Sequence, residues 1–379
     1  MNQLDPLPAA VLPTGISSRF VERVNGLRIH ILEAGEPGRP CLLLLHGFPE
    51  IAYSWRRIMP ALAAAGFHVI APDQRGYGRT TGWSANYDDD LAPFRLLNAV
   101  RDALGLIAAL GIREAAVIGH DFGASVAAWC ALVRPDVFRS LALMSAPFEG
   151  PPSVPFATDG KAPGPPPSPT IHEALAALSR PRKHYQWWYS TRPANAAMWH
   201  CKEGVHDFLR AYFHHKSADW KANKPHKLAG WTAEELAKMP TYYIMDLADD
   251  MPAGVAKEMP SPAEIAACKW LPDSELAVYA EEYRRNGFQG GLNWYRSRTG
   301  GAYEAELQLF SGKTIDVPSI FISGSSDWGV YQRPGAVEKM NGAACTKMTG
   351  VHLLDGAGHW VQQEQAEKVI ELLLEFLKS

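Results

Sequence analysis

A five-residue motif, Gly119-His120-Asp121-Phe122-Gly123, constrains the fold of this chain more than any other feature of its sequence. An apolar run at 115–118 leads into the motif, and a run rich in small residues at 124–132 follows it. Glycines at both ends of such a motif let a strand and a helix approach closely, and a sharp turn between them exposes the central side chain. The motif therefore predicts a strand, a tight turn and a helix, with Asp121 at the tip of the turn.

Asp121 stands where serine is the usual nucleophile of such a turn, and this changes the chemistry that the turn can perform. A carboxylate can displace a leaving group from a saturated carbon and form an ester, whose carbonyl water can then attack. A serine would form an ether, which offers water no carbonyl. Asp121 thus predicts a two-step covalent cycle and argues against an esterase.

Apolar runs alternate with helical patterns along much of the chain, which predicts an α/β protein whose mostly parallel sheet is covered by helices on both faces. We expect strands at 27–32, 41–45, 69–71, 115–118, 140–144, 319–323 and 351–354, and helices at 54–65, 91–110, 124–133 and 362–377. The first two strands lie close together in the sequence, so we expect them to form an antiparallel edge.

The composition changes sharply after residue 147. Residues 150–170 contain eight prolines, which excludes a regular helix or a central strand there. The region from 171 to about 298 is rich in helix formers and holds seven of the twelve tryptophans. It lacks the regularly spaced short apolar runs that predict strands elsewhere in the chain. We therefore predict a core in two parts, 1–147 and 301–379, with a proline-rich linker and a helical cap at 148–300 between them.

Charge and cysteine usage exclude several classes of function. The formal net charge is −3 and the basic residues are scattered, so we expect no nucleic-acid partner and no membrane partner. The five cysteines are widely spaced, which predicts reduced thiols, and residues 1–18 lack a secretory pattern, so we expect a cytoplasmic protein.

We interpret His206, His214 and His215 as surface residues without the spacing of a zinc site, and we expect no metal and no cofactor.

Asp327 and His359 each follow a predicted strand, in loops rich in glycine. Alone, Asp327 would be interpreted as a turn residue and His359 as a loop histidine. The order nucleophile, acid, histidine is the order that α/β-hydrolases use, with each residue beyond the carboxyl end of a strand. Together with Asp121 these residues predict a catalytic triad.

A second turn, His46-Gly47-Phe48-Pro49, follows the predicted strand at 41–45. Glycine there allows the backbone to direct its N–H groups inward, where such donors stabilise an oxyanion. We predict that the backbone N–H groups of Phe48 and Phe122 form an oxyanion hole around the ester of Asp121.

The motif around Asp121, the turn at His46, and the residues Asp327 and His359 together resemble the epoxide hydrolases of the α/β-hydrolase superfamily. The resemblance implies an α/β-hydrolase fold with a mostly parallel eight-stranded sheet and an inserted helical cap. It implies the opening of an epoxide to a vicinal diol, with a small apolar epoxide and water as the partners of the protein. A homodimer is compatible with it.

In this family two cap tyrosines hold and protonate the epoxide oxygen. The segment around Asn293-Trp294-Tyr295-Arg296 nominates Tyr295 as one of them, and a Tyr-Gln pair nominates Tyr185 as the other. Tyr189, Tyr242 and Tyr243 remain competitors. Ring opening places charge on an alkoxide far more basic than a phenol, so two phenols can stabilise that charge and donate a proton.

We also predict a set of side chains that contact the substrate, several of them aromatic. These are His46, Pro49, Gln186, Trp187, Trp294, Trp328 and Trp360. Aromatic side chains around a pocket favour an apolar substrate.

Haloalkane and haloacid dehalogenases are similar in nucleophile, acid and histidine, so they are the nearest alternative. They commonly carry tryptophan or arginine directly after the nucleophile, whereas Phe122 offers no side-chain donor. Phe122 also departs from the tryptophan usual in epoxide hydrolases, and Gly291 replaces a proline that is common there. A ligand-binding protein on the same fold is the alternative from outside the enzymes.

Overall fold

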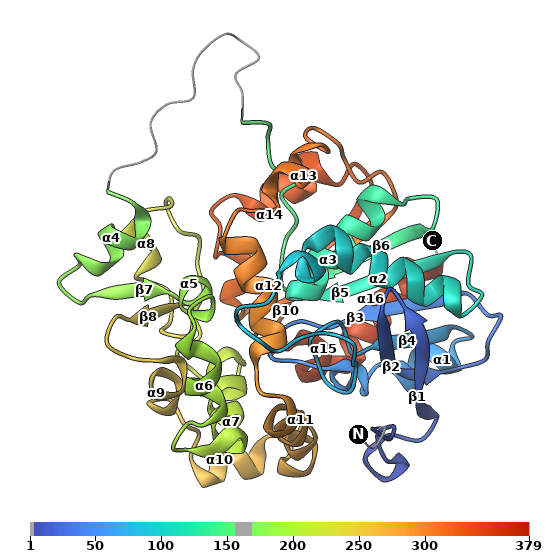
Figure 1. Ribbon diagram of the computed structural model, residues 1–379, viewed down its shortest axis with the longest axis horizontal. Helices are drawn as coiled ribbons and strands as arrows, with labels where there is room; N and C mark the ends of the chain where they lie inside the picture. The colour runs from blue at the N-terminus through green and yellow to red at the C-terminus, as the bar shows by residue number, and fades with distance from the viewer. Residues whose placement is uncertain (1–3, 156–168, 379) are drawn as a thin grey trace.

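The structure is a computed structural model, and it describes residues 4–155 and 169–378. An eight-stranded sheet runs through it in the order β1-β2-β4-β3-β5-β6-β9-β10 (Figure 1). The strands are β1 (Ile16–Val24), β2 (Leu27–Ala34), β3 (Cys41–Leu45), β4 (His68–Pro72), β5 (Ala115–His120), β6 (Phe138–Met144), β9 (Ser319–Gly324) and β10 (Met348–Leu354). The pairs from β4 to β10 are parallel, which confirms the predicted mostly parallel sheet.

The antiparallel edge differs from the one expected. Strand β2 pairs with β1 and with β4, both antiparallel, whereas β3 lies between β4 and β5 and does not pair with β2. The prediction that the strands at 27–32 and 41–45 pair was therefore wrong. It missed β1, because an edge strand with many exposed positions lacks a continuous apolar run.

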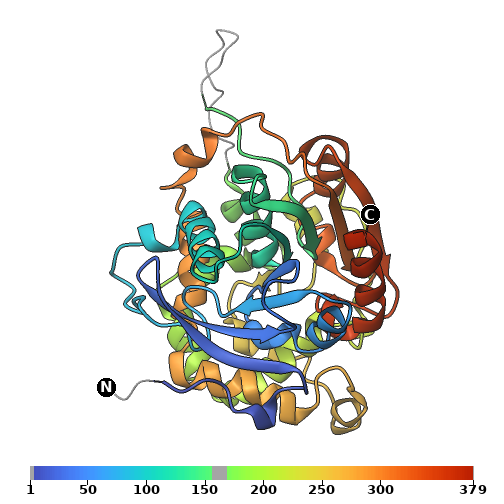
Figure 2. The same cartoon turned by 90° about the vertical axis from the view of Figure 1, so that its right-hand side faces the viewer.

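Helices cover both faces of the sheet. Helices α2 (Leu96–Ala109) and α3 (Phe122–Val133) contact each other, and so do α1 (Met59–Ala64) and α16 (Ala366–Lys378). Figure 2 shows the two pairs on opposite sides of the strands. Three predicted helices are divided. A 3₁₀ turn, η2 (Ala52–Trp55), precedes α1, another, η3 (Ala92–Phe94), precedes α2, and α15 (Val361–Glu364) precedes α16.

Proline explains one of these divisions. Pro60 stands in the first turn of α1, where a missing N–H does no harm, whereas inside a helix over 54–65 it would remove a hydrogen bond. The break between η3 and α2 falls at Arg95, whose ψ of 151° is extended. Between α15 and α16, Gln365 leaves the helical conformation at φ −129° and ψ 50°.

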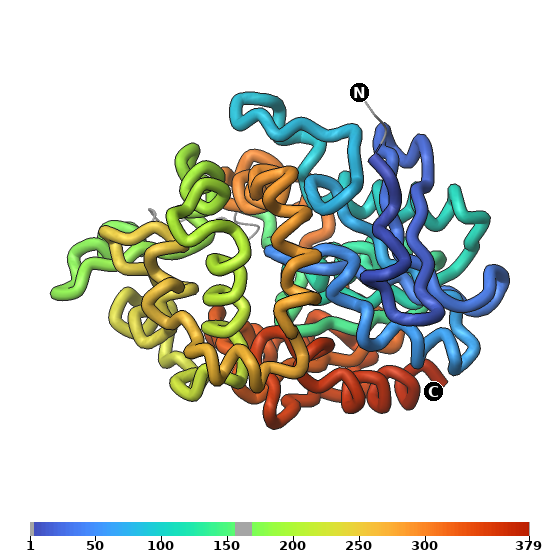
Figure 3. The backbone as a smooth tube through the Cα atoms, turned by 90° about the horizontal axis from the view of Figure 1, so that it is seen from below, coloured from blue at the N-terminus to red at the C-terminus, as the bar shows by residue number. Residues whose placement is uncertain are grey.

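A mainly helical segment connects β6 to β9 and lies against one end of the sheet (Figures 1 and 3). Its helices are α4 (Ile171–Ala176), α5 (Tyr185–Tyr189), α6 (Pro193–Trp199), α7 (Gly204–Lys216), α8 (Ala233–Leu236), α9 (Met251–Ala256), α10 (Pro262–Ala267), α11 (Asp273–Asn286) and α12 (Gln289–Thr299). It also contains a small antiparallel pair, β7 (Arg182–His184) and β8 (Ile244–Asp246), which the sequence reading missed because each strand has only three residues.

Helix α12 contacts α5 on the cap side and η3 on the core side. The chain then returns to the sheet through α13 (Glu304–Gln308), and α14 (Ala336–Lys339) and the π-helical turn η5 (Met340–Ala344) connect β9 to β10. Most of the proline-rich stretch predicted to be a linker lies outside the described residues, and the bounds predicted for core and cap stay a prediction. Within 4–155 and 169–378 no helix is long and apolar enough to cross a membrane.

Candidate active site

Asp121 lies in a strained turn between β5 and α3. Its backbone has φ 52° and ψ −119°, a combination that residues other than glycine rarely adopt. The turn requires the two glycines of the motif. A Cβ on Gly119 would lie 2.2 Å from the Gly123 carbonyl oxygen, and one on Gly123 would lie 2.2 Å from that of Leu45. The Asp121 side chain remains 12% exposed, so a small molecule can reach it.

Substituting Gly123 by alanine should destabilise the protein by about 3 kcal/mol, because the added Cβ collides with backbone atoms of β3 that cannot turn away. Urea unfolding measures the loss. Gly342→Ala is the matched control, since nothing lies within 4 Å of a Cβ at Gly342. A free energy of unfolding that is equal in the two variants would contradict the packing argument.

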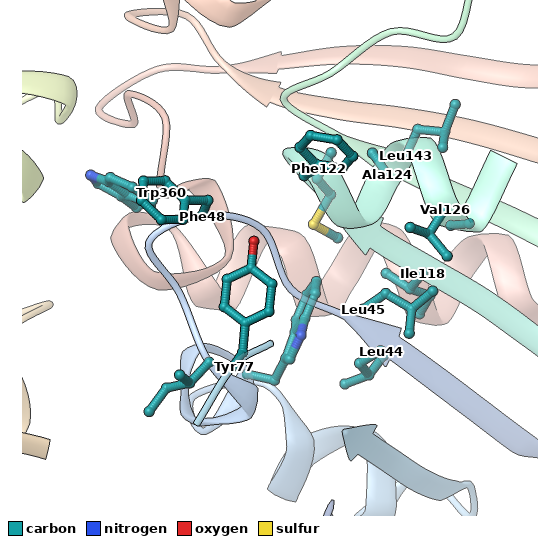
Figure 4. Packing of buried hydrophobic residues seen from close by; sticks show 14 of the residues in the cluster. Leu44, Leu45, Phe48, Tyr77, Ile118, Phe122, Ala124, Val126, Leu143 and Trp360 are labelled. Carbon is teal, nitrogen blue, oxygen red and sulfur yellow. The ribbon is translucent and has the colours of Figure 1, made fainter. Parts of the chain in front are cut away.

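The turn after β3 places a backbone donor on the nucleophile. The Phe48 N–H donates to Asp121 Oδ1 at 3.1 Å, and a Cβ on Gly47 would lie 2.6 Å from the same oxygen. Phe122 is the first residue of α3, where backbone N–H groups have no acceptor within the helix. Phe48 and Phe122 both lie beyond the carboxyl ends of their strands (Figure 4). Their oxyanion role stays a prediction.

His359 lies between the two aspartates of the predicted triad. Its Nε2 is 3.3 Å from Asp121 Oδ2, and its Nδ1 is 3.1 Å from Asp327 Oδ1. The carboxylate of Asp327 is itself held by the Gly329 N–H at 2.7 Å and by the Ser323 hydroxyl at 3.0 Å. The structure thus brings the three residues together, with Asp327 placed to orient the imidazole through Nδ1.

Both aspartates of the triad are stabilised in their ionised form. Burial raises the pKa of Asp121, but His359, Lys216 and His120 together outweigh burial and hold that pKa below its usual value. The same balance of burial and His359 lowers the pKa of Asp327, with help from the Gly329 N–H. An ionised carboxylate is the form that a nucleophile requires.

A second buried network supports the site, and the sequence reading missed it. Glu50 Oε2 accepts the Gly47 N–H at 2.8 Å and lies 2.6 Å from His120 Nδ1. The other nitrogen of His120 lies 2.7 Å from the carbonyl oxygen of His359. This chain of contacts connects the oxyanion turn to the loop of the catalytic histidine. Glu50 directly follows the turn at 46–49, and His120 lies within the motif around Asp121, which is the signal that could have found them.

Lys216, at the end of α7, is a buried cation near the triad that the sequence did not indicate. Its Nζ lies 4.8 to 5.3 Å from the ring centroids of Tyr243, Tyr212 and Trp360. Burial lowers the pKa of Lys216, and its positive charge helps to lower the pKa of Asp121. Its backbone carbonyl oxygen accepts the backbone N–H of His359 at 2.9 Å.

The neighbouring His215 is buried against Trp220 and Tyr242, so its interpretation as a surface residue was wrong.

The two nominated tyrosines approach the nucleophile from the cap. The ring of Tyr295 packs edge-on against Phe122 at 5.3 Å and against Phe48 at 5.5 Å, and Tyr185 lies 6.0 Å from Tyr295. Burial raises the pKa of both phenols well above the usual value, so they stay protonated. The Tyr185 hydroxyl donates to Gln332 Oε1 at 3.3 Å and accepts from Gln186 Nε2 at 3.0 Å.

The hydroxyl groups of the competing tyrosines differ in their partners. The Tyr189 hydroxyl donates to that of Tyr212 at 3.2 Å, and the Tyr242 hydroxyl donates to Asn223 Oδ1 at 2.8 Å. The Tyr243 hydroxyl is buried without a hydrogen-bond partner in the described residues. Because the Tyr185 hydroxyl also has partners, these contacts do not choose among the tyrosines, and the assignment of Tyr185 and Tyr295 stays a prediction.

The tryptophans nominated for substrate contact fall into two groups. Trp294 packs edge-on against Phe122 at 5.2 Å, and Trp360 lies 4.7 Å from the ring of His359. Their indole N–H groups donate to the carbonyl oxygens of Arg75 and Phe213, so only the ring surfaces could meet a substrate. Trp187 packs instead against His172 and His184, and Trp328 packs against His226.

The remaining nominated residues support neighbouring loops. His46 Nε2 accepts the Gln74 N–H at 3.1 Å, which ties the oxyanion turn to the loop after β4. Pro49 follows a cis peptide bond at Phe48, and Gln186 donates to the Tyr185 hydroxyl. Substrate contact by these residues stays a prediction. In the described ranges no cluster of three or more histidine, cysteine or acidic side chains could hold a metal ion.

Comparison with known proteins places this geometry in a family. The α/β-hydrolase fold family matches residues 40–366. The chain is 33% identical to epoxide hydrolase A of Mycobacterium tuberculosis, over 95% of this chain and 97% of that protein, and 31% identical to an epoxide hydrolase of Caballeronia sordidicola, over 97% and 95%.

Solved structures agree. An epoxide hydrolase from an endophytic Streptomyces superposes with a TM-score of 0.74 at 29% identity, over 97% of this chain and 96% of that one. Epoxide hydrolase A from Mycobacterium thermoresistibile superposes with a TM-score of 0.71 at 32% identity, over 96% of this chain and 98% of that one. The chain therefore belongs to the epoxide hydrolases of the α/β-hydrolase fold family.

Proposed function

We propose that this protein opens an epoxide to a vicinal diol through a covalent ester of Asp121. The observation that carries the proposal is the position of the Asp121 carboxylate, with one oxygen on the Phe48 N–H and the other 3.3 Å from His359 Nε2. Two protonated tyrosines, Tyr185 and Tyr295, lie across from it on the cap.

In the first step Asp121 Oδ2 attacks a ring carbon of the epoxide, and the bond from that carbon to the ring oxygen breaks. The electron pair goes to the oxygen, which takes a proton from one of the two tyrosine hydroxyls while the other donates a hydrogen bond. Phenols suit this role because they are far more acidic than the alkoxide that would otherwise leave.

In the second step water attacks the ester carbonyl while His359 removes a proton from that water. The carbonyl oxygen, Asp121 Oδ1, becomes anionic and is stabilised by the Phe48 N–H, which already donates to it. Collapse of this intermediate breaks the bond from the carboxyl carbon to Oδ2, and the departing alkoxide takes the proton held by His359 and leaves as the diol. The new carboxyl group of Asp121 gives up the remaining proton of the water and becomes a carboxylate again. Asp327 stabilises the imidazolium that forms on His359. The proton released by the Asp121 carboxyl group then returns to the tyrosine.

A single turnover in ¹⁸O-labelled water tests the mechanism. Excess enzyme is mixed with an aryl epoxide, and the diol and the peptide containing Asp121 are analysed by mass spectrometry. Attack through an ester predicts an unlabelled diol and ¹⁸O in the peptide, because water adds to the carboxyl carbon. Label in the diol would remove Asp121 as the nucleophile and indicate direct attack by water.

The rate of ester formation should be nearly independent of pH between about pH 5 and about pH 9. The reason is that the pKa of Asp121 is lowered, so the nucleophile stays ionised on the acid side, and the pKa values of Tyr185 and Tyr295 are raised, so the donors stay protonated on the alkaline side. Rapid mixing of excess enzyme with an epoxide measures this rate. An acid limb with its midpoint near pH 5 would contradict the assignment.

Two further assays separate the alternatives. A dehalogenase would release halide from a haloalkane or a haloacid, and Phe122 lacks the side-chain donor that would stabilise that ion. A ligand-binding protein would bind an epoxide saturably and form no ester. Cytoplasmic location and a homodimeric assembly stay predictions.

A further inference from the structure

Arg298 lies on the last turn of α12, three residues after Tyr295, and residues three apart in a helix lie on the same side. Its guanidinium carbon is 6.0 Å from the centroid of the Phe122 ring, against which Tyr295 also packs. A cation therefore lies beside the residue that follows the nucleophile and close to a proposed proton donor. The mechanism above makes no use of it.

The Arg298 side chain has no ion pair and no hydrogen bond in the part of the chain that the structure describes. Arginines elsewhere around the core differ, since Arg56 pairs with Glu275 and Arg75 pairs with Asp102. The charge of the Glu149 carboxylate raises the pKa of Arg298, but that carboxylate already forms an ion pair with Arg333 at 2.5 Å. Two arginines thus share one carboxylate, which leaves a net positive charge beside the site.

Arg298 is accessible to solvent, whereas Tyr295, one turn earlier on the same side of α12, is buried. Burial lowers the pKa of the Arg298 guanidinium, and the phenols of Tyr185 and Tyr295 act on that pKa in the opposite direction. Arg298 is thus a cation that a ligand can reach, on the side of α12 that carries Tyr295 and beside the Phe122 ring.

We infer that Arg298 binds a carboxylate of the substrate, so that the preferred substrates are epoxides that carry an acid group near the oxirane ring. This inference rests on the proposed function. A guanidinium presents paired N–H donors that match the two oxygens of a carboxylate, and such charged hydrogen bonds strengthen where water is partly excluded. Because Arg298 follows Tyr295 by about one helical turn on the same side of α12, the acid group would lie close to the oxirane ring.

A matched pair of substrates tests the inference. 3-Phenylglycidate and its primary amide differ in the charge next to the ring, and the ratio of their kcat/KM values measures the preference for the acid. We expect the wild-type enzyme to prefer the acid by about 10- to 100-fold, the range that a charged hydrogen bond supplies. Arg298→Gln should remove most of this preference, and Arg298→Lys should retain part of it.

Arg296→Gln is the control, because it removes the same charge from the same helix. The Arg296 guanidinium lies 3.5 Å from the Tyr87 ring centroid and donates to Asn293 Oδ1, so it is engaged elsewhere. This variant should keep the full preference. A wild-type enzyme without preference, or an Arg298→Gln variant with an unchanged ratio, would overturn the inference. If neither the acid, nor the amide, nor a neutral aryl epoxide gives diol, the proposed function fails instead.

Discussion

Replacing His359 by glutamine should stop the enzyme after one ester has formed on each molecule. His359 is the base that activates water, and its Nε2 lies 3.3 Å from the nucleophile. Loss of the base should lower kcat by roughly 10⁴-fold or more, the range found when a catalytic histidine is removed. Ester formation needs only the carboxylate and the tyrosines, so the covalent adduct should accumulate.

Intact-protein mass spectrometry after mixing with an aryl epoxide detects the adduct, and peptide analysis locates it. Asp121→Ala should give neither adduct nor diol. His352→Gln is the matched control, since this half-buried histidine belongs to the edge strand β10, and it should turn over at the wild-type rate. A His359→Gln variant that produces diol at the normal rate, or forms no adduct, would refute the assigned role.

Replacing both Tyr185 and Tyr295 by phenylalanine should slow ester formation by roughly 10³-fold or more, because the alkoxide then leaves without a proton donor. Each single substitution should cost less, since the remaining phenol still donates. The rings remain in the double variant, so their packing against Phe48, Phe122 and each other is retained. Rapid-mixing measurement of the first step checks the rate.

Tyr242→Phe is the control for this pair, because the Tyr242 hydroxyl already donates to Asn223 Oδ1 at 2.8 Å. It should leave ester formation unchanged. If Tyr189→Phe or Tyr243→Phe caused the large loss instead, the two donors would have been assigned to the wrong tyrosines. A double variant that keeps its rate would favour a leaving group that needs no proton, such as a halide.

The features that the sequence predicted well are local in the chain. The turn at Asp121 depends on residues within a few positions, because Gly119 and Gly123 allow contacts that any side chain would block. Strand β3 is buried at every position, so its apolar run is unbroken and its bounds were predicted to the residue. Asp327 and His359 each follow a buried or half-buried strand, and parallel strands end at the same edge of a sheet.

The features that the sequence did not predict depend on contacts between distant segments. After β2 the chain leaves one position of the sheet empty, forms β3, and then returns to place β4 between β2 and β3, and no local sequence pattern indicates this order. Glu50 and His120 are 70 residues apart, yet they form one buried pair behind the site. Lys216 is one basic residue among many in the sequence. Only the packing of α7 beside the triad makes it a buried cation.

By itself the sequence determined the class of fold and the chemical groups of the site. Strand periodicity, glycine turns and the identity of the nucleophile depend only on residues that are close together in the sequence. Only the tertiary structure decided which groups meet. The contact of His359 with Asp121, the burial of Lys216 and the unpaired charge of Arg298 arise where the cap meets the carboxyl ends of the strands. Such contacts join residues that are far apart in the chain, and their distances depend on how whole helices pack.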